Sequence, residues 1–252
     1  MDTILYRKQG HVAIVTFNRP EVLNAVTRAM WKRMEEVWAD VNEDKEVRAV
    51  ILTGAGERAF SAGPDMKEMA SLPPSAPKPK VWEDGDIQVW KPVITAVNGL
   101  AMASGFSMVL ASDIRIAVED AVFGMTQVRW GIASGTGTQL LPRSLPYAVA
   151  LELLLTGRTI DARRAYELGV INKLAPRASL MDTALEVAQL ISENAPLAVQ
   201  HSKESAIRGI GMGVADAMRW GYAMEKLNGM TEDSKEGPKA FVEKRKPVWQ
   251  SR

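Results

Sequence analysis

Two short stretches of small residues are the first candidates for chemistry in this chain, because each directly follows a predicted buried strand. Phe60-Ser61-Ala62-Gly63-Pro64-Asp65 comes after residues 49–53, and residues 98–113 (NGLAMASGFSMVLASD) follow residues 93–97 and lead into a helix. Small side chains let a backbone approach a ligand closely, and a helix start presents unpaired N–H groups. Two such turns can each aim one N–H at a single carbonyl oxygen, which is an oxyanion hole. Tight packing of a helix on a sheet also uses small residues and remains the alternative.

The residues give little support to other catalytic devices. The chain has no cysteine, which excludes thiolate nucleophiles, disulfides and cysteine-based metal sites. His11 falls in a predicted hairpin and His201 on a C-terminal helix, and no pattern places either beside a nucleophile or clustered carboxylates. We therefore predict that both histidines are structural and that no metal is bound. Residues 54–59 fit the G-x-G-x-x-A pattern, but no amphipathic helix follows, so we expect no nucleotide site there.

The composition is that of an ordinary globular protein. Of 252 residues, 46% are apolar and 24% charged, and the net charge of +1 gives no reason to expect a nucleic acid or an anionic membrane as partner. No apolar run approaches the ~18 residues of a transmembrane helix. The N-terminus has no basic segment followed by an apolar one, so we expect no signal peptide. The lack of cysteine is compatible with a reducing compartment, and we expect a cytoplasmic protein.

Strands and helices alternate in the N-terminal half. Residues 3–6 and 11–17 are predicted to pair as a hairpin, with the turn at Gln9-Gly10. Residues 27–42 carry apolar side chains at helical spacing, and Thr27 is the predicted N-cap. The repeated order of strand, helix and strand favours an α/β fold with right-handed crossovers.

The middle of the chain contains more loops. Residues 72–80 are proline-rich and are predicted to form a mobile loop, followed by a short helix over residues 81–90. We expect a glycine-rich loop at residues 131–138 and a helix over residues 159–168. From about residue 180 onward we expect only helices.

One group of apolar residues on the C-terminal helices is too apolar for a solvated surface. It must be covered by the core or by another subunit, and its members are Met212, Met218, Trp220, Tyr222 and Met224. We expect two regions, an α/β core over residues 1–195 and a helical region over residues 196–252.

Several motifs, in order along nearly the whole chain, resemble the enoyl-CoA hydratase/isomerase, or crotonase, superfamily. They are RPEVLNA (19–25), AFSAGPD (59–65), PVITAVNG with ASGFSMVLASD (92–113), FGMTQVRWGI (123–132), LLLTGR (153–158), A-x-x-x-G-V-I-N (165–172) and AFVEKRKP (240–247). The resemblance implies an α/β spiral of ββα turns with a C-terminal helical region that forms a homotrimer, or a hexamer of paired trimers. It implies an acyl-CoA thioester substrate, with coenzyme A as part of the substrate and no other cofactor. The proline-rich loop then lies beside the acyl pocket.

The resemblance also assigns residues. It makes the N–H groups of Ala62 and Ser104 the oxyanion donors; the family usually has glycine at the second position, so the Ser104 side chain must point away. A groove for coenzyme A is implied at Val22, Ala25, Gly63, Asp65 and Met66. Phe241 and Lys244 match residues that reach coenzyme A, often from a neighbouring subunit, and Lys244 is either a phosphate ligand or an ordinary solvated lysine.

The catalytic positions depart from the family pattern. Hydratases of the family carry two glutamates, which match Ser107 and Gln127 here, and neither of these residues titrates near neutral pH. Ser107 resembles the serine of hydroxycinnamoyl-CoA hydratase-lyases, but those enzymes keep the second glutamate. Glu83, Asp84 and Asp86 are candidate replacement carboxylates, and a solvated acidic turn is the alternative that we favour for them.

The function expected from the sequence is an acyl-CoA-transforming enzyme, a lyase or isomerase, that stabilises a thioester enolate. Isomerisation, C–C cleavage, decarboxylation and thioester hydrolysis all use such an oxyanion hole. A catalytically silent member that only binds acyl-CoA is the alternative from a different class.

Overall fold

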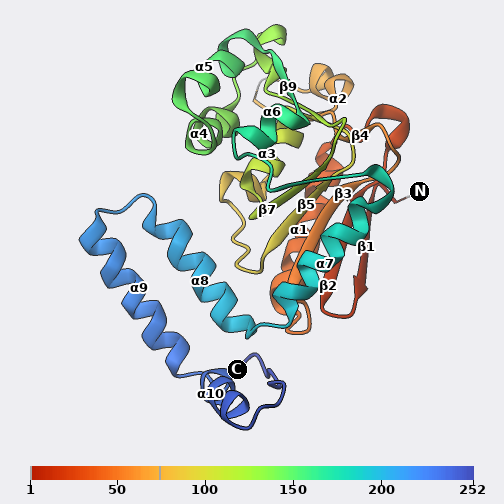
Figure 1. The fold of residues 1–252 in the computed structure, drawn as a ribbon. Coiled ribbons are helices and arrows are strands. Elements are labelled where there is room, and N and C mark those ends of the chain that lie inside the picture. The colour runs from red at the N-terminus through yellow and green to blue at the C-terminus, as the bar shows by residue number, and fades with distance from the viewer. Residues whose placement is uncertain (1, 74) are drawn as a thin grey trace.

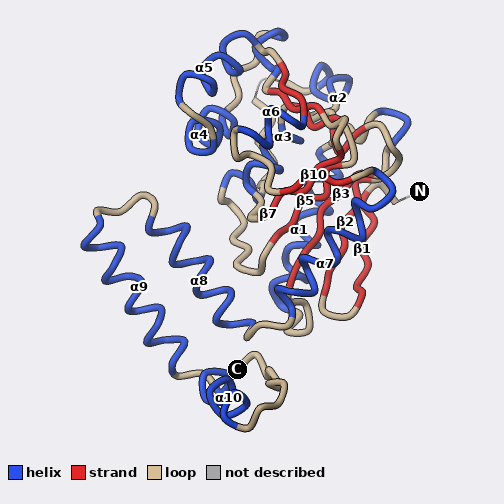
Figure 2. The backbone as a smooth tube through the Cα atoms, viewed as in Figure 1, coloured by secondary structure: helices blue, strands red, loops and turns tan. Residues whose placement is uncertain are grey.

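Two β-sheets form the body of the structure, a computed structural model that describes residues 2–73 and 75–252 (Figures 1 and 2). Within those residues, the first sheet has six strands in the order β1 (Ile4–Gln9), β2 (Val12–Phe17), β3 (Ala49–Gly54), β5 (Val93–Val97), β7 (Ile114–Val118) and β10 (Lys173–Ala175). The second has four, in the order β4 (Ala59–Ser61), β6 (Leu100–Met102), β8 (Val122–Gly124) and β9 (Thr159–Asp161).

Helices complete the described part of the chain. The α-helices are α1 (Arg28–Glu43), α2 (Met66–Ser71), α3 (Ser104–Ala111), α4 (Gly135–Ser144), α5 (Tyr147–Thr156), α6 (Ala162–Glu167), α7 (Leu180–Ser192), α8 (Pro196–Gly209), α9 (Val214–Gly229) and α10 (Glu232–Val242). Short 3₁₀ turns are η1 (Pro20–Val22), η2 (Trp82–Asp84), η3 (Thr126–Trp130) and η4 (Arg177–Ser179).

The chain repeats one unit of two strands and a helix. β3, β5 and β7 are parallel neighbours in the first sheet, and each is followed by a strand of the second sheet, namely β4, β6 and β8. A helix closes each unit, and these are α2, α3 and, after η3, α4. The expected spiral of ββα turns is confirmed.

The two predicted N-terminal elements are confirmed with small shifts of their ends. β1 and β2 pair antiparallel as a hairpin, and Gly10 has the positive φ of +56° that the turn requires. The Thr27 hydroxyl accepts a hydrogen bond of 3.3 Å from Met30 N–H and caps α1. The apolar face of α1, which includes Met30, Met34 and Trp38, is buried in the core.

The centre of the first sheet is the most buried part of the molecule. All residues of β3 and β5 are buried, as expected for parallel strands that are covered on both faces. α7 packs across β2, β3, β5 and β7. This rigid layer anchors the strand ends from which the second sheet and its loops continue.

Three predicted elements differ from the structure. Residues 81–90 form only the short turn η2, because Gly85 takes a left-handed φ of +83° that ends it. Ser134 caps Gly137 N–H, so α4 begins within the expected glycine-rich loop, at Gly135. The expected helix over residues 159–168 begins as strand β9, which pairs with β8, and only α6 is helical.

The C-terminal helices extend away from the two sheets. α8 and α9 lie side by side as an arm whose tip is the turn between them, and α10 follows α9 at the other end, near the start of α8 and the C-terminus (Figure 1). Met224 is buried, but Met218 and Tyr222 are 54% and 64% exposed. The core of the same chain therefore leaves most of the apolar group predicted from the sequence uncovered.

No helix in the described residues combines the length and the apolar character that crossing a membrane requires.

We predict that the uncovered apolar face of α9 is buried between subunits, because a patch of this kind is costly in water. Sedimentation should show a trimer or a multiple of a trimer. Met218→Glu with Tyr222→Glu should shift the protein towards smaller species, since burying unpaired charges is unfavourable. The charge reversal Lys45→Glu, in the exposed turn before β3, is the control. A wild type that sediments as a stable monomer at micromolar concentration would contradict the prediction.

Candidate active site

The two turns of small residues lie side by side because the strands before them pair. β4 and β6 are parallel neighbours, with Ser61 opposite Ala101. A Cβ on Gly63 would lie 2.7 Å from the Ala103 Cβ, and a Cβ on Gly105 would lie 2.5 Å from the Ser61 carbonyl oxygen. Only glycine fits at both positions, so the predicted convergence of the two turns is confirmed.

Buried asparagines hold the loop before the first turn. Asn24 Nδ2 and Asn98 Nδ2 both donate to the Ala59 carbonyl oxygen, at 2.8 and 3.1 Å. The Ser61 hydroxyl donates to the Asn24 carbonyl oxygen at 2.9 Å. The asparagines of the LNA and VNG motifs therefore fix the strand end from which the turn departs.

The first turn offers no N–H group to a ligand, so the expectation that Ala62 supplies one oxyanion donor is wrong. Its nitrogens are accounted for as follows: Ala62 N–H donates to Leu23 O (2.9 Å), Gly63 N–H to Ser61 Oγ (3.1 Å) and Asp65 N–H to Val26 O (2.9 Å), while Pro64 has no N–H. The physical reason is that the turn pairs with the segment around Leu23 and Val26, which takes up the donors.

The second turn leaves its first helical N–H available. Ala103 has φ +53° and donates its N–H to the Gly124 carbonyl oxygen at 2.9 Å, which holds this strained residue at the helix start. The first N–H that bonds back within the turn is that of Ser107, to the Ala103 carbonyl oxygen. Ser104 N–H precedes it and is one of the orphan donors of α3. The geometry is therefore compatible with the predicted role of Ser104 N–H.

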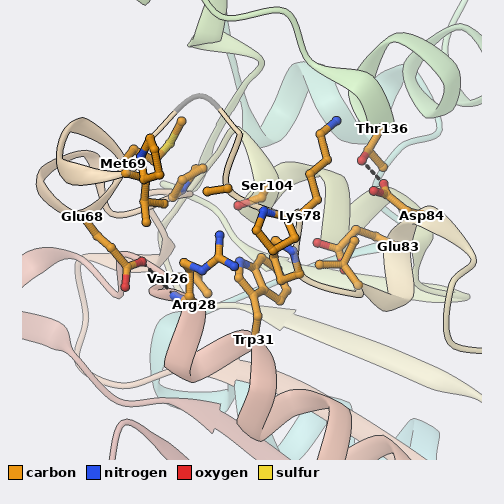
Figure 3. A pocket seen from close by; sticks show the side chains of 17 residues that line it. Val26, Arg28, Trp31, Glu68, Met69, Lys78, Glu83, Asp84, Ser104 and Thr136 are labelled. Atoms are coloured by element: carbon orange, nitrogen blue, oxygen red, sulfur yellow. Dashed lines mark hydrogen bonds between the residues drawn. The ribbon is translucent and has the colours of Figure 1, made fainter.

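A cavity of about 430 Å³ opens beside Ser104, between α1, α2, η2 and the proline-rich loop (Figure 3). Most of its wall is apolar; the apolar residues on it include Val26, Trp31, Pro64, Met69, Leu72 and Val81. The loop predicted to lie beside the acyl pocket contributes Leu72, Pro73 and residues 76–79; residue 74 lies outside the described residues. Ser104 lines the cavity, but its hydroxyl oxygen is buried, which is compatible with the expectation that this side chain points away.

Glu83 is the buried carboxyl of this cavity. It is only 7% exposed, and Figure 3 shows its side chain reaching into the pocket opposite Val26 and Glu68. Burial raises the pKa of Glu83 to about 8, and the nearby charge of Asp84 acts in the same direction. The favoured alternative of a solvated acidic turn is therefore wrong for Glu83.

The neighbouring acids differ from Glu83. Asp84 is exposed but lines the cavity and accepts a hydrogen bond from the Thr136 hydroxyl. Asp86 is exposed and does not line the cavity, as expected for a solvated residue. Of the three acids, Glu83 is thus the one that burial sets apart.

Charged groups also line the opposite side of the cavity. Glu68 Oε2 accepts the Arg28 N–H at 2.8 Å and so caps the start of α1. Arg28 lines this side, and Lys78 of the proline-rich loop lines the cavity nearer Thr136 (Figure 3); neither side chain forms an ion pair within residues 2–73 and 75–252. Both cations are free to meet an anionic part of a ligand.

Ser107 and Gln127, the positions that match the hydratase glutamates, are not on the cavity wall. The Ser107 hydroxyl donates back to the Ala103 carbonyl oxygen at 3.3 Å, and the residue is 1% exposed. Gln127 Nε2 lies 4.0 Å from Met125 Sδ, and its Oε1 is buried without a hydrogen-bond partner among the described residues. A catalytic role for this pair stays a prediction.

The residues predicted to bind coenzyme A fall into two groups. Val22 and Met66 are exposed near the first turn. Asp65 accepts hydrogen bonds from the first N–H groups of α2 and pairs with Arg19 at 2.9 Å, and the Arg19 guanidinium lowers the pKa of this carboxyl. Its carboxylate is thus occupied in the fold. The Ala25 carbonyl oxygen accepts from the same guanidinium at 2.7 Å.

The second group is far from the first within one chain. Phe241 is 86% exposed at the end of α10, and Lys244 follows it with φ +54°. α10 lies at the opposite end of the molecule from α2 (Figure 1). One subunit therefore does not bring Phe241 and Lys244 to the cavity, and their role stays a prediction that requires a neighbouring subunit.

The histidines lie elsewhere. His11 Nδ1 is 2.8 Å from the Glu46 carbonyl oxygen, and His201 Nδ1 is 3.4 Å from Asn228 Oδ1. Neither lines the cavity. The described residues hold no cluster of side chains suited to a metal ion.

Some features of the site were not predicted from the sequence. The sequence shows that Pro64 has no N–H. Only the pairing with Val26 shows that the Pro64 nitrogen is the one in this turn that no backbone partner would take up. Thr136 and Asp84 are far apart in sequence, and no pattern announces their contact. Arg28 lies in the predicted helix, and nothing in the sequence marks it as part of a cavity.

Comparisons with known proteins agree with this architecture. The family model described as enoyl-CoA hydratase/isomerase matches residues 7–252. The chain is 39% identical to an (E)-benzylidenesuccinyl-CoA hydratase of Thauera aromatica over 95% of this chain and 96% of the relative. It is 39% identical to a short-chain-enoyl-CoA hydratase of Clostridium acetobutylicum over 98% and 97% of the two chains. The crystal structure of an enoyl-CoA hydratase from Mycobacterium tuberculosis superimposes with a TM-score of 0.93 at 33% identity, covering 99% of each chain. By its fold, its paired turns and these likenesses, the chain belongs to the enoyl-CoA hydratase/isomerase family.

Proposed function

We propose that this protein transfers a proton at the carbons next to the carbonyl of an acyl-CoA thioester, and that Glu83 carries the proton. The observation that carries the proposal is a single buried carboxyl facing a largely apolar cavity beside a helix start. A carboxyl whose pKa lies near the working pH is suited to both donate and accept a proton.

The thioester group and the acyl chain of such a substrate each have a place in the site. The thioester oxygen lies at the start of α3, where the Ser104 N–H stabilises negative charge. The acyl chain lies in the cavity against Trp31 and Met69, and Glu83 faces its first carbons. With a pKa of about 8, Glu83 is ionised in a minor fraction at pH 7, and this fraction can accept a carbon-bound proton and then return it. Coenzyme A enters as part of the substrate, and no further cofactor is needed.

Migration of a double bond is the reaction that this geometry supports best. It needs one group that takes a proton from one carbon and returns it to another, and no bound water. Reversible hydration is the second candidate, because relatives are named as hydratases and because Asp84 with Thr136 forms a polar pair on the same wall that can hold a water. In both reactions Glu83 moves the proton.

We predict that Glu83→Gln lowers acyl-CoA turnover by about 10²–10⁴-fold, the typical contribution of a positioned acid or base. The measurement is deuterium incorporation from heavy water into a panel of 2-enoyl and 3-enoyl thioesters, followed by mass spectrometry. Isomerisation gives a shifted double bond, and hydration gives a mass gain of one water.

The matched control is Asp86→Asn, an exposed acid outside the cavity wall, which should leave turnover unchanged. Full activity in the Glu83→Gln protein would show that another group carries the proton. A wild type that binds the thioesters but neither exchanges nor converts them would favour the silent, binding-only alternative.

Keeping Glu83 buried has a cost in stability that depends on pH. Its pKa is raised in the folded state, so the folded protein binds the proton more tightly than the unfolded chain. The stability of the wild type therefore falls as pH rises from about 4.5 to about 8, at ~1.4 kcal/mol per unit. Below this window both states are protonated and the cost vanishes.

We predict that Glu83→Gln is more stable than the wild type at pH 8.5, by on the order of 3–5 kcal/mol in the free energy of unfolding, because glutamine stays neutral. The difference should shrink towards zero near pH 4.5. Urea unfolding of both proteins at pH 5, 7 and 8.5 measures it. A difference that does not vary with pH would show that Glu83 titrates normally.

A further inference from the structure

Among the described residues, the first turn presents no backbone donor to the cavity. Pro64 forms a parallel bridge with Val26, in which the Gly63 carbonyl oxygen accepts from Val26 N–H (2.8 Å) and Asp65 N–H donates to Val26 O (2.9 Å). Backbone groups alternate sides along an extended segment, so the nitrogen of Pro64 points away from Val26. Pro64 itself lines the cavity. An N–H at this position would serve a ligand, and proline removes it.

The opposite turn carries an unexplained donor. The Ser104 hydroxyl oxygen is buried and has no hydrogen-bond partner within the described residues. The residue itself lines the cavity, so a rotation about its Cα–Cβ bond would turn the hydroxyl towards a ligand there, and its N–H is also free at the start of α3 (Figure 3). Buried polar atoms are almost always hydrogen-bonded, so an orphan of this kind calls for a partner that the protein alone does not supply.

The contacts between the turns connect the two observations. A Cβ added at Gly63, the residue before Pro64, would lie 3.4 Å from the Ser104 nitrogen. Ser104 is therefore directly beside the place where the first turn lacks its donor. A serine hydroxyl can rotate to donate to an oxygen that the neighbouring N–H also reaches.

We propose that Ser104 supplies both donors to the thioester oxygen, its backbone N–H and its hydroxyl, and that the hydroxyl replaces the N–H that Pro64 lacks. This inference rests on the proposed acyl-CoA function but not on the role of Glu83. It makes Ser104 a catalytic residue through its side chain as well as its backbone.

The test uses cinnamoyl-CoA, whose conjugated thioester absorbs at longer wavelength when its carbonyl oxygen accepts strong hydrogen bonds. Bound to the wild type, it should show a clear red shift. Ser104→Ala and Ser104→Gly keep the N–H and lose the hydroxyl, so most of the shift should disappear. Turnover should fall by about 10²–10³-fold, the typical effect of one oxyanion donor, with a much smaller change in Kd. Ser71→Ala, an exposed serine outside the cavity wall, is the matched control and should keep the shift.

A second variant tests the exchange of donors directly. Pro64→Ala restores an N–H on the first turn, so Ser104→Ala with Pro64→Ala should regain the red shift and much of the lost turnover. A full shift in the Ser104→Ala protein would overturn the inference while leaving the acyl-CoA function intact. Failure of the double variant to regain any shift would overturn the assignment of Pro64 as the missing donor. Failure of the wild type to bind cinnamoyl-CoA or other acyl-CoA thioesters would overturn the proposed function itself, and this inference with it.

Discussion

The close approach of two backbone turns is the constraint on which the rest of the site depends. β4 and β6 pair, and Gly105 lies so close to the Ser61 carbonyl oxygen that a Cβ would lie 2.5 Å from it. That approach sets where α3 begins, and with it the position of its orphan N–H groups. It also holds Ala103 at a positive φ, a strain that the surrounding hydrogen bonds maintain. The spiral of ββα turns is the means by which two strands that are distant in sequence reach this contact.

The cavity has one rigid wall and one built from irregular chain. The rigid wall consists of the paired turns with α1 and α2, and buried hydrogen bonds of Asn24 and Asn98 fix the strand end before the first turn. The other consists of the proline-rich loop and η2, which carries Glu83. In the function proposed here, the rigid wall holds the thioester oxygen and the irregular wall supplies the proton carrier.

The burial that makes Glu83 useful is also unfavourable for folding. Burial in an apolar wall disfavours the ionised carboxylate and so raises the pKa of Glu83. At a pH where the unfolded chain carries this group ionised, the folded protein is therefore less stable. A residue kept at such a cost is a candidate for function. The C-terminal helices also have features that one chain does not explain. Apolar side chains of α9 are uncovered, and Phe241 of α10 lies far from the cavity. In the assembly proposed here, a neighbouring subunit covers the apolar side chains, and Phe241 reaches the cavity of that neighbour.

The sequence by itself determined the family, the alternation of strands and helices, and the meeting of the two turns. These follow from local patterns, such as runs of small residues after apolar strands, and from motifs in order along the chain. Only the tertiary structure decided which N–H groups are free. The family resemblance assigned Ala62 as a donor, but Leu23, nearly forty residues earlier, accepts its hydrogen bond. Glu83 looked solvated because its neighbours are acidic, but packing against α3 and the proline-rich loop removed it from water. Hydrogen-bond occupancy and burial depend on contacts between distant segments, and no local pattern encodes them.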